Sequence, residues 1–402
     1  MKIALISVFL DDGYEHILDD KFMEDVVCQE DHHYHRTAHS LKMRNHEPIV
    51  FYISVEKELK KFTHKYGHTI IRIPVKKIPF FHEPIIYSPE LIKQIENNFD
   101  LSLVFSYYVM YKVPDMFDYI IRKLKWKMPI IGRWSGGKHQ WLFPIRRRIK
   151  KNSLKNCNKI ICAGKDEIEV LKNVFKIPVT KIEFMINPHN LELFKKRDRI
   201  DVCKKIEISP VKKYLLYVGR LVKNKGIEEL LEVFNEIKSE YSDINLIFIG
   251  DGLLKEEILK FLEKNNLKDK IQLKGRLPHD IICYYYNACS ILFHIGTSGG
   301  LPNVVVEGVA SGIPVIASKN NANSDFVNRK LKTGIIIEAG DKIGLKNAIK
   351  EIIEMPENFL GEVPEIIKEL SFERYGEKLE ILFKKSLEDI KNTRFDEDSQ
   401  KS

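Results

Sequence analysis

The stretch that decides the fold is YLLYVGRLVKNKGI, residues 214–227. Its first five residues are apolar and favour β structure, which is typical of a buried strand in a parallel sheet. Gly219 then permits a tight turn, and the polar residues after it lead into an amphipathic run that begins at Ile227. A buried strand, a glycine turn and a helix in this order predict one βα unit of a doubly wound sheet.

The same strand–helix alternation continues along the whole chain of 402 residues. Short apolar runs, several of them continuous, alternate with longer amphipathic stretches, as in proteins whose parallel sheets are covered on both faces. The predicted strands are 2–8, 49–54, 70–74, 101–105, 129–132, 159–163, 183–186, 214–219, 245–250, 271–275, 291–294, 314–317 and 334–338. We therefore expect an α/β protein with two Rossmann-like doubly wound domains that face each other across a ligand-binding cleft.

The domain boundaries are predicted from one polar segment and from the pattern near the C-terminus. Residues 195–210 are polar and are broken by aspartate and proline, so they are the best candidate for a linker. The predicted parts are an N-terminal domain at 1–197, a C-terminal domain at 198–371, a helix at 372–392 that packs back on the N-terminal domain, and a frayed tail at 393–402.

The net charge of +9 is concentrated in the first half of the chain. Residues 101–200 carry 22 Lys and Arg side chains against 8 Asp and Glu, whereas residues 201–402 carry 30 against 32. This asymmetry predicts that one face of the first domain meets an anionic partner, and it does not fit a uniformly basic nucleic-acid-binding protein. The segment WLFPIRRRIKK, residues 141–151, predicts contact with an anionic membrane, although a solvated basic helix or a site for a phosphorylated acceptor fits it equally well.

The composition favours a cytoplasmic protein that is at most peripheral at the inner face of the membrane. A membrane-spanning helix needs about 20 consecutive apolar residues, and no run in the sequence approaches that length. Residues 1–10 have no small-residue cleavage site after them, so they indicate a first strand and not a signal peptide. The six cysteines include no C-x-x-C pair, which disfavours disulfides and structural zinc.

The turn after the strand at 214–219 carries two cations, Arg220 and Lys225. Both precede the predicted helix, and the N-terminus of a helix is the positive end of its dipole. Two fixed cations at such an end make a binding site for a diphosphate. A solvated basic loop is the alternative explanation of these two residues.

A second glycine-containing turn, GGLPNVVVE at residues 299–307, follows the strand at 291–294 and leads into another helix. Its glycines let a ligand approach the backbone, its proline suits the first helical turn, and the amides after the proline face an anion. The residues concerned are Gly299, Gly300, Pro302, Asn303 and Val304. Glu307 lies one turn further on, where a carboxylate can accept two hydrogen bonds from the vicinal diol of a ribose.

At this point the residues resemble a known family, the nucleotide-sugar glycosyltransferases of family four, which have the GT-B fold. The resemblance covers most of residues 210–340. It rests on Gly219-Arg220 with Lys225-Gly226, IGDG at 249–252, GRL at 275–277, GLPNVVVEG at 300–308 and SGIPVIA at 311–317. The first half is matched more loosely, by the strand at 1–8 with Gly13, by NHEP at 45–48 and by FMIN at 184–187.

The resemblance implies a role for each of these residues. Arg220 and Lys225 would bind the diphosphate of the donor and act in catalysis, and Glu307 would hold its ribose. The other donor-binding residues that it implies are Gly219, Arg276, Leu277, Gly299, Gly300, Leu301, Pro302, Asn303 and Val304. Enzymes of this family are usually retaining and need no metal or other cofactor, in agreement with two cations that can neutralise a leaving diphosphate.

Two positions depart from the family pattern. Gly299 stands where the family usually has a glutamate that faces the donor sugar. Many members have a histidine after the strand equivalent to 129–132, and this chain has RWSGG at 133–137 instead. Ser135 is the candidate to replace that imidazole, and together with Gly13 it forms the acceptor side of the predicted site.

Four histidines between residues 32 and 39 raise the question of a metal. His35 and His39 are four residues apart, a spacing that can ligate zinc from one face of a helix. No cysteine or matched carboxylate motif accompanies them, so a polar helix that faces the acceptor is the preferred interpretation. We expect no metal site.

Three functions fit these residues. The first is a retaining, hexosyltransferase-like enzyme that moves a sugar from a nucleoside diphosphate sugar to a glycan, lipid or other small acceptor, in cell-surface polysaccharide or glycolipid biosynthesis. The second is a nucleotide- or glycan-binding protein with weakened catalysis, which Gly299 suggests. The third is a nucleotide-sugar epimerase of the same architecture. A dehydrogenase is disfavoured because no strand is followed by G-x-G-x-x-G.

Overall fold

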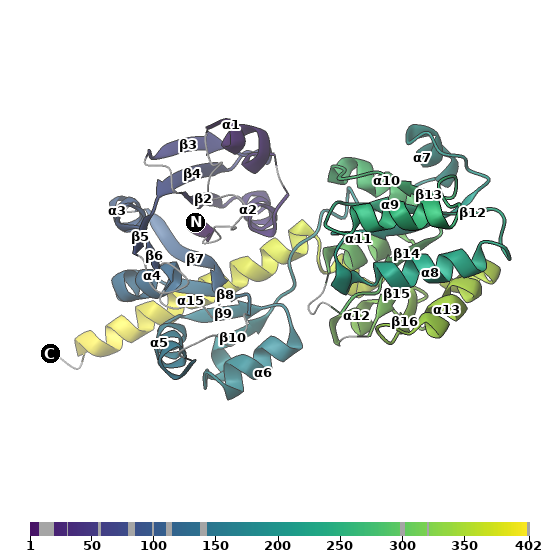
Figure 1. Cartoon of the computed structure of the whole chain (residues 1–402). Helices are drawn as coiled ribbons and strands as arrows, with labels where there is room; N and C mark the ends of the chain where they lie inside the picture. The colour runs from purple at the N-terminus through teal and green to yellow at the C-terminus, as the bar shows by residue number, and fades with distance from the viewer. Residues whose placement is uncertain are drawn as a thin grey trace. The chain divides into compact units, whose positions relative to one another are not determined.

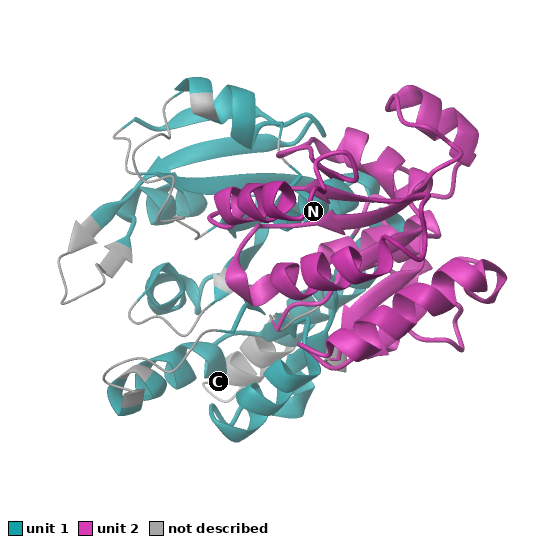
Figure 2. Cartoon of the chain, turned by 45° about the vertical axis from the view of Figure 1, so that its right-hand side comes forward, with its two compact units in different colours: residues 1–188, 372–402 teal, residues 189–371 magenta. Residues whose placement is uncertain are grey.

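The computed structural model describes residues 1–7, 20–29, 31–54, 58–78, 85–98, 100–109, 115–136, 143–297, 302–319 and 321–399. The chain divides into two compact units, shown in different colours in Figure 2. Unit 1 comprises residues 1–188 and 372–402, and unit 2 comprises residues 189–371. The chain therefore enters unit 2 before the expected boundary at residue 197, and it returns to unit 1 after Ser371.

Unit 1 is built on a large parallel sheet. Its described strands are β1 (Lys2–Ser7), β2 (Glu47–Ser54), β3 (Lys60–Thr63), β4 (Thr69–Pro74), β5 (Lys76–Ile78), β6 (Ile85–Tyr87), β7 (Leu101–Val109), β8 (Ile130–Trp134), β9 (Lys159–Cys162) and β10 (Ile182–Phe184). Eight of them form one sheet in the order β10-β9-β8-β7-β1-β2-β4-β3, in which only the edge strand β3 is antiparallel to its neighbour. β5 and β6 form a separate antiparallel pair.

Helices cover both faces of this sheet. The described ones are α1 (Asp20–Phe22), η1 (Met23–Val27), α2 (His33–Met43), α3 (Pro89–Asn97), α4 (Met116–Leu124), α5 (Phe143–Lys155), α6 (Lys165–Asn173), η2 (Val179–Lys181) and α15 (Phe372–Ser399). Ile3 and Leu5 of β1 pack in one hydrophobic cluster with α2 and α15, while Ala4 and Ile6 pack in another with α3 and α4. Two buried faces explain why the strands are continuous apolar runs.

Unit 2 is built on a six-stranded parallel sheet. Its strands are β11 (Lys213–Val218), β12 (Ile244–Ile249), β13 (Ile271–Leu273), β14 (Ile291–His294), β15 (Val315–Ser318) and β16 (Gly334–Ile337), in the order β13-β12-β11-β14-β15-β16. Its helices are α7 (Arg199–Lys205), η3 (Lys223–Lys225), α8 (Ile227–Ile237), α9 (Lys255–Lys264), α10 (His279–Ala288), α11 (Asn303–Ser311), α12 (Asn321–Phe326), α13 (Lys342–Glu354), η4 (Pro356–Phe359) and α14 (Glu365–Lys368). The prediction of an α/β protein with two doubly wound parallel sheets is thus confirmed.

Two segments differ from the expected organisation. The predicted linker contains α7, because Asp198 caps a helix by accepting hydrogen bonds from the amides of Ile200 and Asp201. This helix packs on α10, so the segment belongs to unit 2.

α15, the long yellow helix in Figure 1, extends to Ser399 and not only to residue 392. It contributes to the core of unit 1 through side chains such as Leu379 and Phe383.

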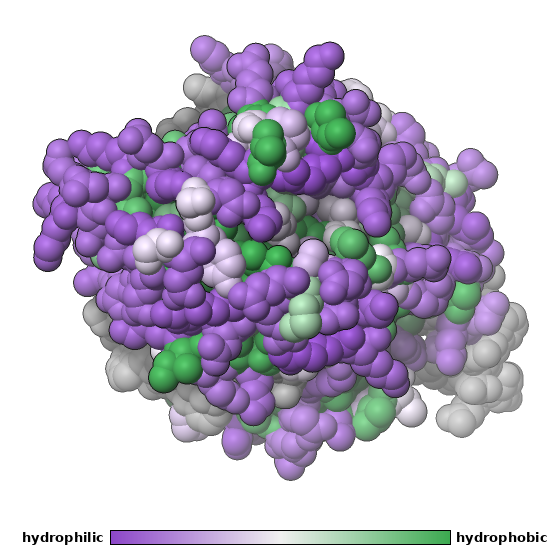
Figure 3. All heavy atoms as spheres, turned by 90° about the vertical axis from the view of Figure 1, so that its right-hand side faces the viewer, coloured by the Kyte–Doolittle hydropathy of each residue, from purple (hydrophilic) through white to green (hydrophobic). Residues whose placement is uncertain are grey.

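The surface of unit 2 drawn in Figure 3 is mostly hydrophilic, with hydrophobic side chains exposed singly or in small groups. Such scattered exposure is ordinary for a folded protein and marks no extended hydrophobic patch on that face. Among the described residues, no helix has both the length and the apolar character that a membrane span requires.

Candidate functional site

Two hydrogen bonds fix the conformation of the loop after β11. The Tyr217 hydroxyl donates to the carbonyl oxygen of Arg220 at 3.0 Å, and the amide of Leu221 donates to the carbonyl oxygen of Asp251 at 3.0 Å. The second of these bonds ties the loop after β11 to the loop after β12. Arg220 therefore lies in a fixed backbone conformation at the carboxyl end of the sheet, although its side chain is exposed.

The loop after β11 also touches the end of β14, its neighbour on the other side. Gly226 has φ +72°, and a Cβ atom there would lie 2.8 Å from the carbonyl oxygen of Ile295. A Cβ atom at Gly296 would lie 2.5 Å from the carbonyl oxygen of Asn224, and the amide of Thr297 donates to that same oxygen at 3.1 Å. Both positions require glycine, because any side chain would push the two loops apart.

These contacts lie at the switch point of the sheet. β11 pairs with β12 on one side and with β14 on the other, so the connections leave the carboxyl edge in opposite directions at β11. In open α/β sheets, ligands bind outside the carboxyl ends of the strands at this point. Of the predicted site residues, the structure brings Gly219, Arg220 and Lys225 together here.

The two cations of the loop repel each other. Burial and the positive charge of Arg220 lower the pKa of Lys225 from its ordinary value. His294, at the end of β14, has its pKa lowered to about 4 by burial and by the charge of Lys225, so its imidazole is neutral at pH 7. An anion bound between Arg220 and Lys225 would relieve this repulsion.

Glu307 lies in α11, the helix that follows β14. Its side chain is only 2% exposed, and Oε2 accepts a hydrogen bond from the Tyr286 hydroxyl at 3.0 Å. Tyr286, on α10, therefore fixes the orientation of the carboxylate. The sequence gives no signal for this contact, because only the packing of α10 on α11 brings the Tyr286 hydroxyl to Glu307.

The remaining predicted residues are placed as follows. Pro302 is the N-cap residue of α11, one position before the first helical turn in which it was expected, and Asn303 and Val304 begin that turn. Arg276 is exposed and Leu277 is half-buried in the loop after β13, which is tied to β12 by a 2.7 Å hydrogen bond from the amide of Gly250 to the carbonyl oxygen of Gly275.

Several predicted residues cannot be compared with the fold. Gly13, Gly299, Gly300 and Leu301 lie outside the described residues. Ser135 is described and exposed directly after β8, where its amide donates to the carbonyl oxygen of Val109 at 2.9 Å. It therefore stands at the carboxyl end of two neighbouring strands of unit 1.

The histidine cluster of unit 1 is not the pair considered from the sequence. His35 meets His64 and His68 of the β3–β4 turn, and one nitrogen from each of the three rings lies within 4.8 Å of the others, a group that could hold a metal ion. His39 stacks on Tyr66 instead, with 4.3 Å between ring centroids. The three rings of the cluster stack on one another, and the His64 Nδ1 accepts a hydrogen bond from the amide of Tyr66 at 3.1 Å.

Comparisons with known proteins show which family unit 2 resembles. Residues 198–369 match the family model described as glycosyl transferases group 1. The chain is 35% identical to an uncharacterized glycosyltransferase of Methanocaldococcus jannaschii over 162 residues, which are 40% of this chain and 44% of the relative. It is 26% identical over 196 residues to a Campylobacter jejuni enzyme named as an N-acetylgalactosaminyltransferase that acts on a diphospho-undecaprenol-linked sugar, covering 48% and 50% of the two chains. The chain thus spans about half the length of the curated relatives it matches.

A solved structure supports the fold over nearly the whole chain. HepE of Anabaena, in complex with UDP and glucose, superposes with a TM-score of 0.66 and 14% identity, and covers 96% of this chain and 100% of its own. The predicted resemblance is confirmed by these matches. The protein therefore has the GT-B fold, and its residues 198–369 are similar to the group 1 glycosyl transferases.

Proposed function

We propose that this protein is a glycosyltransferase that moves a sugar from a nucleoside diphosphate sugar to a glycan, lipid or other small acceptor. The observation that carries the proposal is the junction of the loops after β11 and β14, where direct backbone contact fixes Lys225 close to Arg220. The group 1 match covers both loops. The UDP bound by HepE, which has the same fold, supports a nucleoside diphosphate as the anion that this junction receives.

Arg220 and Lys225 would act on the leaving group. Negative charge grows on the departing diphosphate as the bond to the sugar breaks, and fixed cations stabilise that charge more in the transition state than in the ground state. Burial and the neighbouring charge of Arg220 lower the pKa of Lys225, and a bound diphosphate would offset both effects. We propose that these two side chains serve in place of a divalent metal and that the transfer retains the configuration of the sugar.

Glu307 would bind the ribose of the donor. The hydrogen bond from Tyr286 holds Oε2, so the carboxylate is oriented before any ligand arrives. Orientation in advance reduces the entropy that is lost on binding. The backbone around Pro302 to Val304, with Gly219, Arg276 and Leu277, would complete the donor site.

The acceptor is proposed from unit 1 and from the relatives. The basic excess of residues 101–200 favours an anionic partner for unit 1, and the Campylobacter relative is named for a lipid-linked acceptor. We propose a role in cell-surface polysaccharide or glycolipid synthesis at the cytoplasmic side of a membrane, with a peripheral contact between unit 1 and anionic lipid. Ser135 and Gly13 are the acceptor-side candidates.

A ligand screen followed by turnover measurements tests the function. We expect one nucleoside diphosphate to raise the melting temperature, because a ligand that binds only the folded state stabilises it by mass action. The matching nucleotide sugar should then release free nucleoside diphosphate when an acceptor is supplied, equally in EDTA and in Mg²⁺, and the product anomer should keep the donor's configuration by NMR.

Other outcomes would identify a different function. Binding of the nucleotide sugar without release of nucleoside diphosphate would leave a binding protein. Conversion of the donor to an epimer without any acceptor would identify an epimerase. Loss of turnover in EDTA that Mg²⁺ or Mn²⁺ restores would disprove metal independence alone, and an inverted anomer would disprove retention alone.

A further inference from the structure

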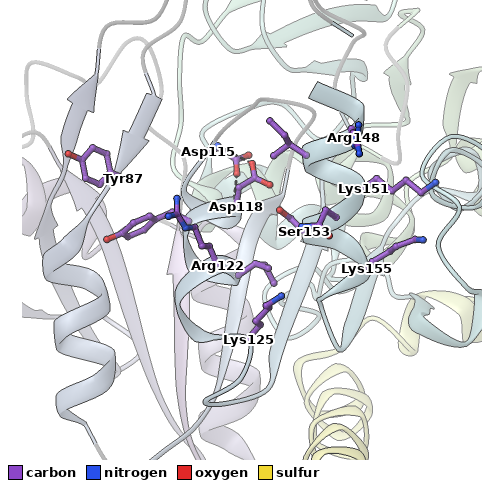
Figure 4. Close-up of a pocket in the computed structure, with 13 residues that line it drawn as sticks. Tyr87, Asp115, Asp118, Arg122, Lys125, Arg148, Lys151, Ser153 and Lys155 are labelled. Carbon is purple, nitrogen blue, oxygen red and sulfur yellow. Dashed lines mark hydrogen bonds between the residues drawn. The ribbon is translucent and has the colours of Figure 1, made fainter. Parts of the chain in front are cut away.

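A pocket of about 900 Å³ on unit 1 is not used by the proposed function. It lies between α4 and α5, with Tyr87 of β6 at one edge (Figure 4). In this view the two helices run side by side, with Asp115, Asp118 and Ser153 between them. A volume of this size is ample for a small-molecule ligand.

The two acidic groups of the pocket share one buried cation from within the fold. Lys150 is completely buried, and its Nζ donates to Asp115 and Asp118 at 2.8 Å each. Asp118 also interacts with the hydroxyl of Ser153. The negative charge of these carboxylates is therefore directed to Lys150 and offers little to a cationic ligand.

The other charged side chains that line the pocket are all cations: Arg122, Lys125, Arg148, Lys151 and Lys155. Among the described residues, none of these five makes an ion pair with a carboxylate, and Lys125 instead donates to the amide oxygen of Asn156 at 3.1 Å. These five cations outnumber the single negative charge that remains when Asp115 and Asp118 share Lys150. The pocket therefore has a positive potential, which favours a ligand with more than one negative charge.

The pocket also has apolar walls. Tyr87 and Tyr119 meet edge to face at one side, with 5.6 Å between ring centroids. Ile121 lines the pocket from α4, and Ile149 lines it from α5 with 38% of its surface exposed. Trp126, next to Lys125, is 75% exposed. Large apolar side chains at the rim of a cationic pocket are typical of surfaces that meet lipid headgroups and the chains below them.

We propose that the pocket between α4 and α5 binds the phosphate group of a lipid, with the cations on the phosphate and the isoleucine and tyrosine side chains on the start of the apolar chain. This assigns the membrane contact of unit 1 to a defined site. The site requires neither donor nor turnover, so it stands or falls separately from the proposed glycosyl transfer.

The first experiment measures binding to vesicles by flotation at low salt, without donor. We expect the protein to float with phosphatidylcholine vesicles that contain phosphatidic acid and not with vesicles of pure phosphatidylcholine. Each Lys or Arg near an anionic surface strengthens binding by about fivefold, so the triple variant Arg122→Ala, Arg148→Ala, Lys151→Ala should bind about a hundredfold more weakly. Replacing the same three residues so that each cation is kept (Arg122→Lys, Arg148→Lys, Lys151→Arg) should restore most of the binding.

A matched control separates the pocket from general charge. The triple variant Lys61→Ala, Lys93→Ala, Lys385→Ala removes three exposed cations of unit 1 that do not line the pocket. This control variant should lose far less vesicle binding than the pocket variant. An equal loss in both variants would show diffuse attraction and overturn the proposal, as would equal binding to vesicles without phosphatidic acid.

The second experiment distinguishes a lipid phosphate from other anions by using soluble ligands in calorimetry. Short-chain phosphatidic acid should bind with one-to-one stoichiometry and at least tenfold more tightly than inorganic phosphate or pyrophosphate. Ile149→Ser should weaken binding of the lipid and leave the affinity for inorganic phosphate unchanged. Equal affinity for inorganic phosphate, or tighter binding of a single-stranded oligonucleotide that displaces the lipid, would overturn the assignment to a lipid.

Discussion

At the scale of single residues, the two cations of the donor site give the sharpest prediction. Arg220→Ala and Lys225→Ala should each lower kcat by about a hundredfold, because one fixed electrostatic contact to a developing charge contributes on that order. Lys223→Ala is the matched control, since Lys223 is an exposed cation of the same turn. Steady-state kinetics with the donor found by screening provide the measurement, and an unchanged kcat in both variants would refute the diphosphate assignment.

Glu307 should respond differently from the cations. A hydrogen bond to ribose is alike in ground and transition states, so Glu307→Gln should raise the donor KM about tenfold and leave kcat nearly unchanged. Tyr286→Phe, which releases Oε2 of Glu307, should raise KM in the same direction by a smaller factor. Tyr285→Phe is the control, because Tyr285 is buried on the same helix and is not the tyrosine that donates to Glu307. A fall in kcat with unchanged KM would contradict the ribose role.

Lys150 should be critical for the stability of unit 1. Lys150→Met leaves Asp115 and Asp118 buried without their cation, and breaking a buried ion pair from one side typically costs about 3–5 kcal/mol of unfolding free energy. Burial already raises the pKa of Asp115 to about 7, so protonation should relieve part of the loss. Urea unfolding should show a large loss at pH 7.5 that shrinks towards pH 5, with little change in Lys151→Met.

At the scale of elements, the stack of imidazoles between α2 and the β3–β4 turn predicts a pH dependence. Burial holds the pKa of His35 well below its ordinary value of 6.5 and lowers that of His68 to about 3. Both side chains are therefore neutral when folded, whereas the unfolded chain protonates them below pH 6.5. Stability is fully present above pH 6.5 and is lost as the pH falls, by about 1.4 kcal/mol per histidine at pH 5.5.

Unfolding in urea at pH 7.5 and pH 5.5 tests this dependence. His68→Gln should reduce the difference in unfolding free energy between the two pH values. An equal pH dependence in wild type and His68→Gln would show that the cluster contributes nothing to it.

The elements also show what a sequence reveals and what it does not. The strand at 291–294 was predicted with its observed bounds, because a strand buried on both faces is a continuous apolar run. β3 was missed because only Phe62 of its four residues is buried, and an edge strand of Lys, Lys and Thr has no such signal. β5 and β6 are three residues each, too short for any periodicity. α7 has the composition of a linker because only Val202 and Cys203 of its seven residues are buried.

The site was predictable in part for a similar reason. Motifs such as Gly219-Arg220 and Lys225-Gly226 are local, so the sequence alone indicates them. The contact of Gly226 with Ile295 and the hydrogen bond from Tyr286 to Glu307 join residues from different elements. Such contacts depend on strand order and helix packing, which a single sequence does not specify.

At the scale of the whole molecule, the return of α15 to unit 1 predicts that the two units depend differently on the C-terminal segment. Ending the chain at Ser371 removes Tyr375, Leu379, Leu382 and Phe383 from the core of unit 1. Large buried side chains contribute about 2–5 kcal/mol each, so unit 1 should unfold while unit 2 remains folded.

The three tryptophans make this test selective. Trp126, Trp134 and Trp141 all belong to unit 1, so their fluorescence reports that unit, while far-ultraviolet circular dichroism reports both. The shortened chain should show tryptophan emission of an unfolded protein with about half of the dichroism retained. A chain that lacks only residues 400–402 should behave as the full chain, and native tryptophan emission after truncation at Ser371 would show that α15 is dispensable.

The interrupted course of unit 1 has a consequence for how the protein is made. A ribosome produces residues 1–188 first, but the segment that closes their core is translated only after all of unit 2. Synthesis proceeds at about 5–20 residues per second, so the nascent first unit waits on the order of ten seconds or more with the surface that α15 will cover still open. Unit 2 can complete its fold during that interval. The unit that is synthesised first is thus completed last, and a chaperone would be needed at its exposed apolar face during translation.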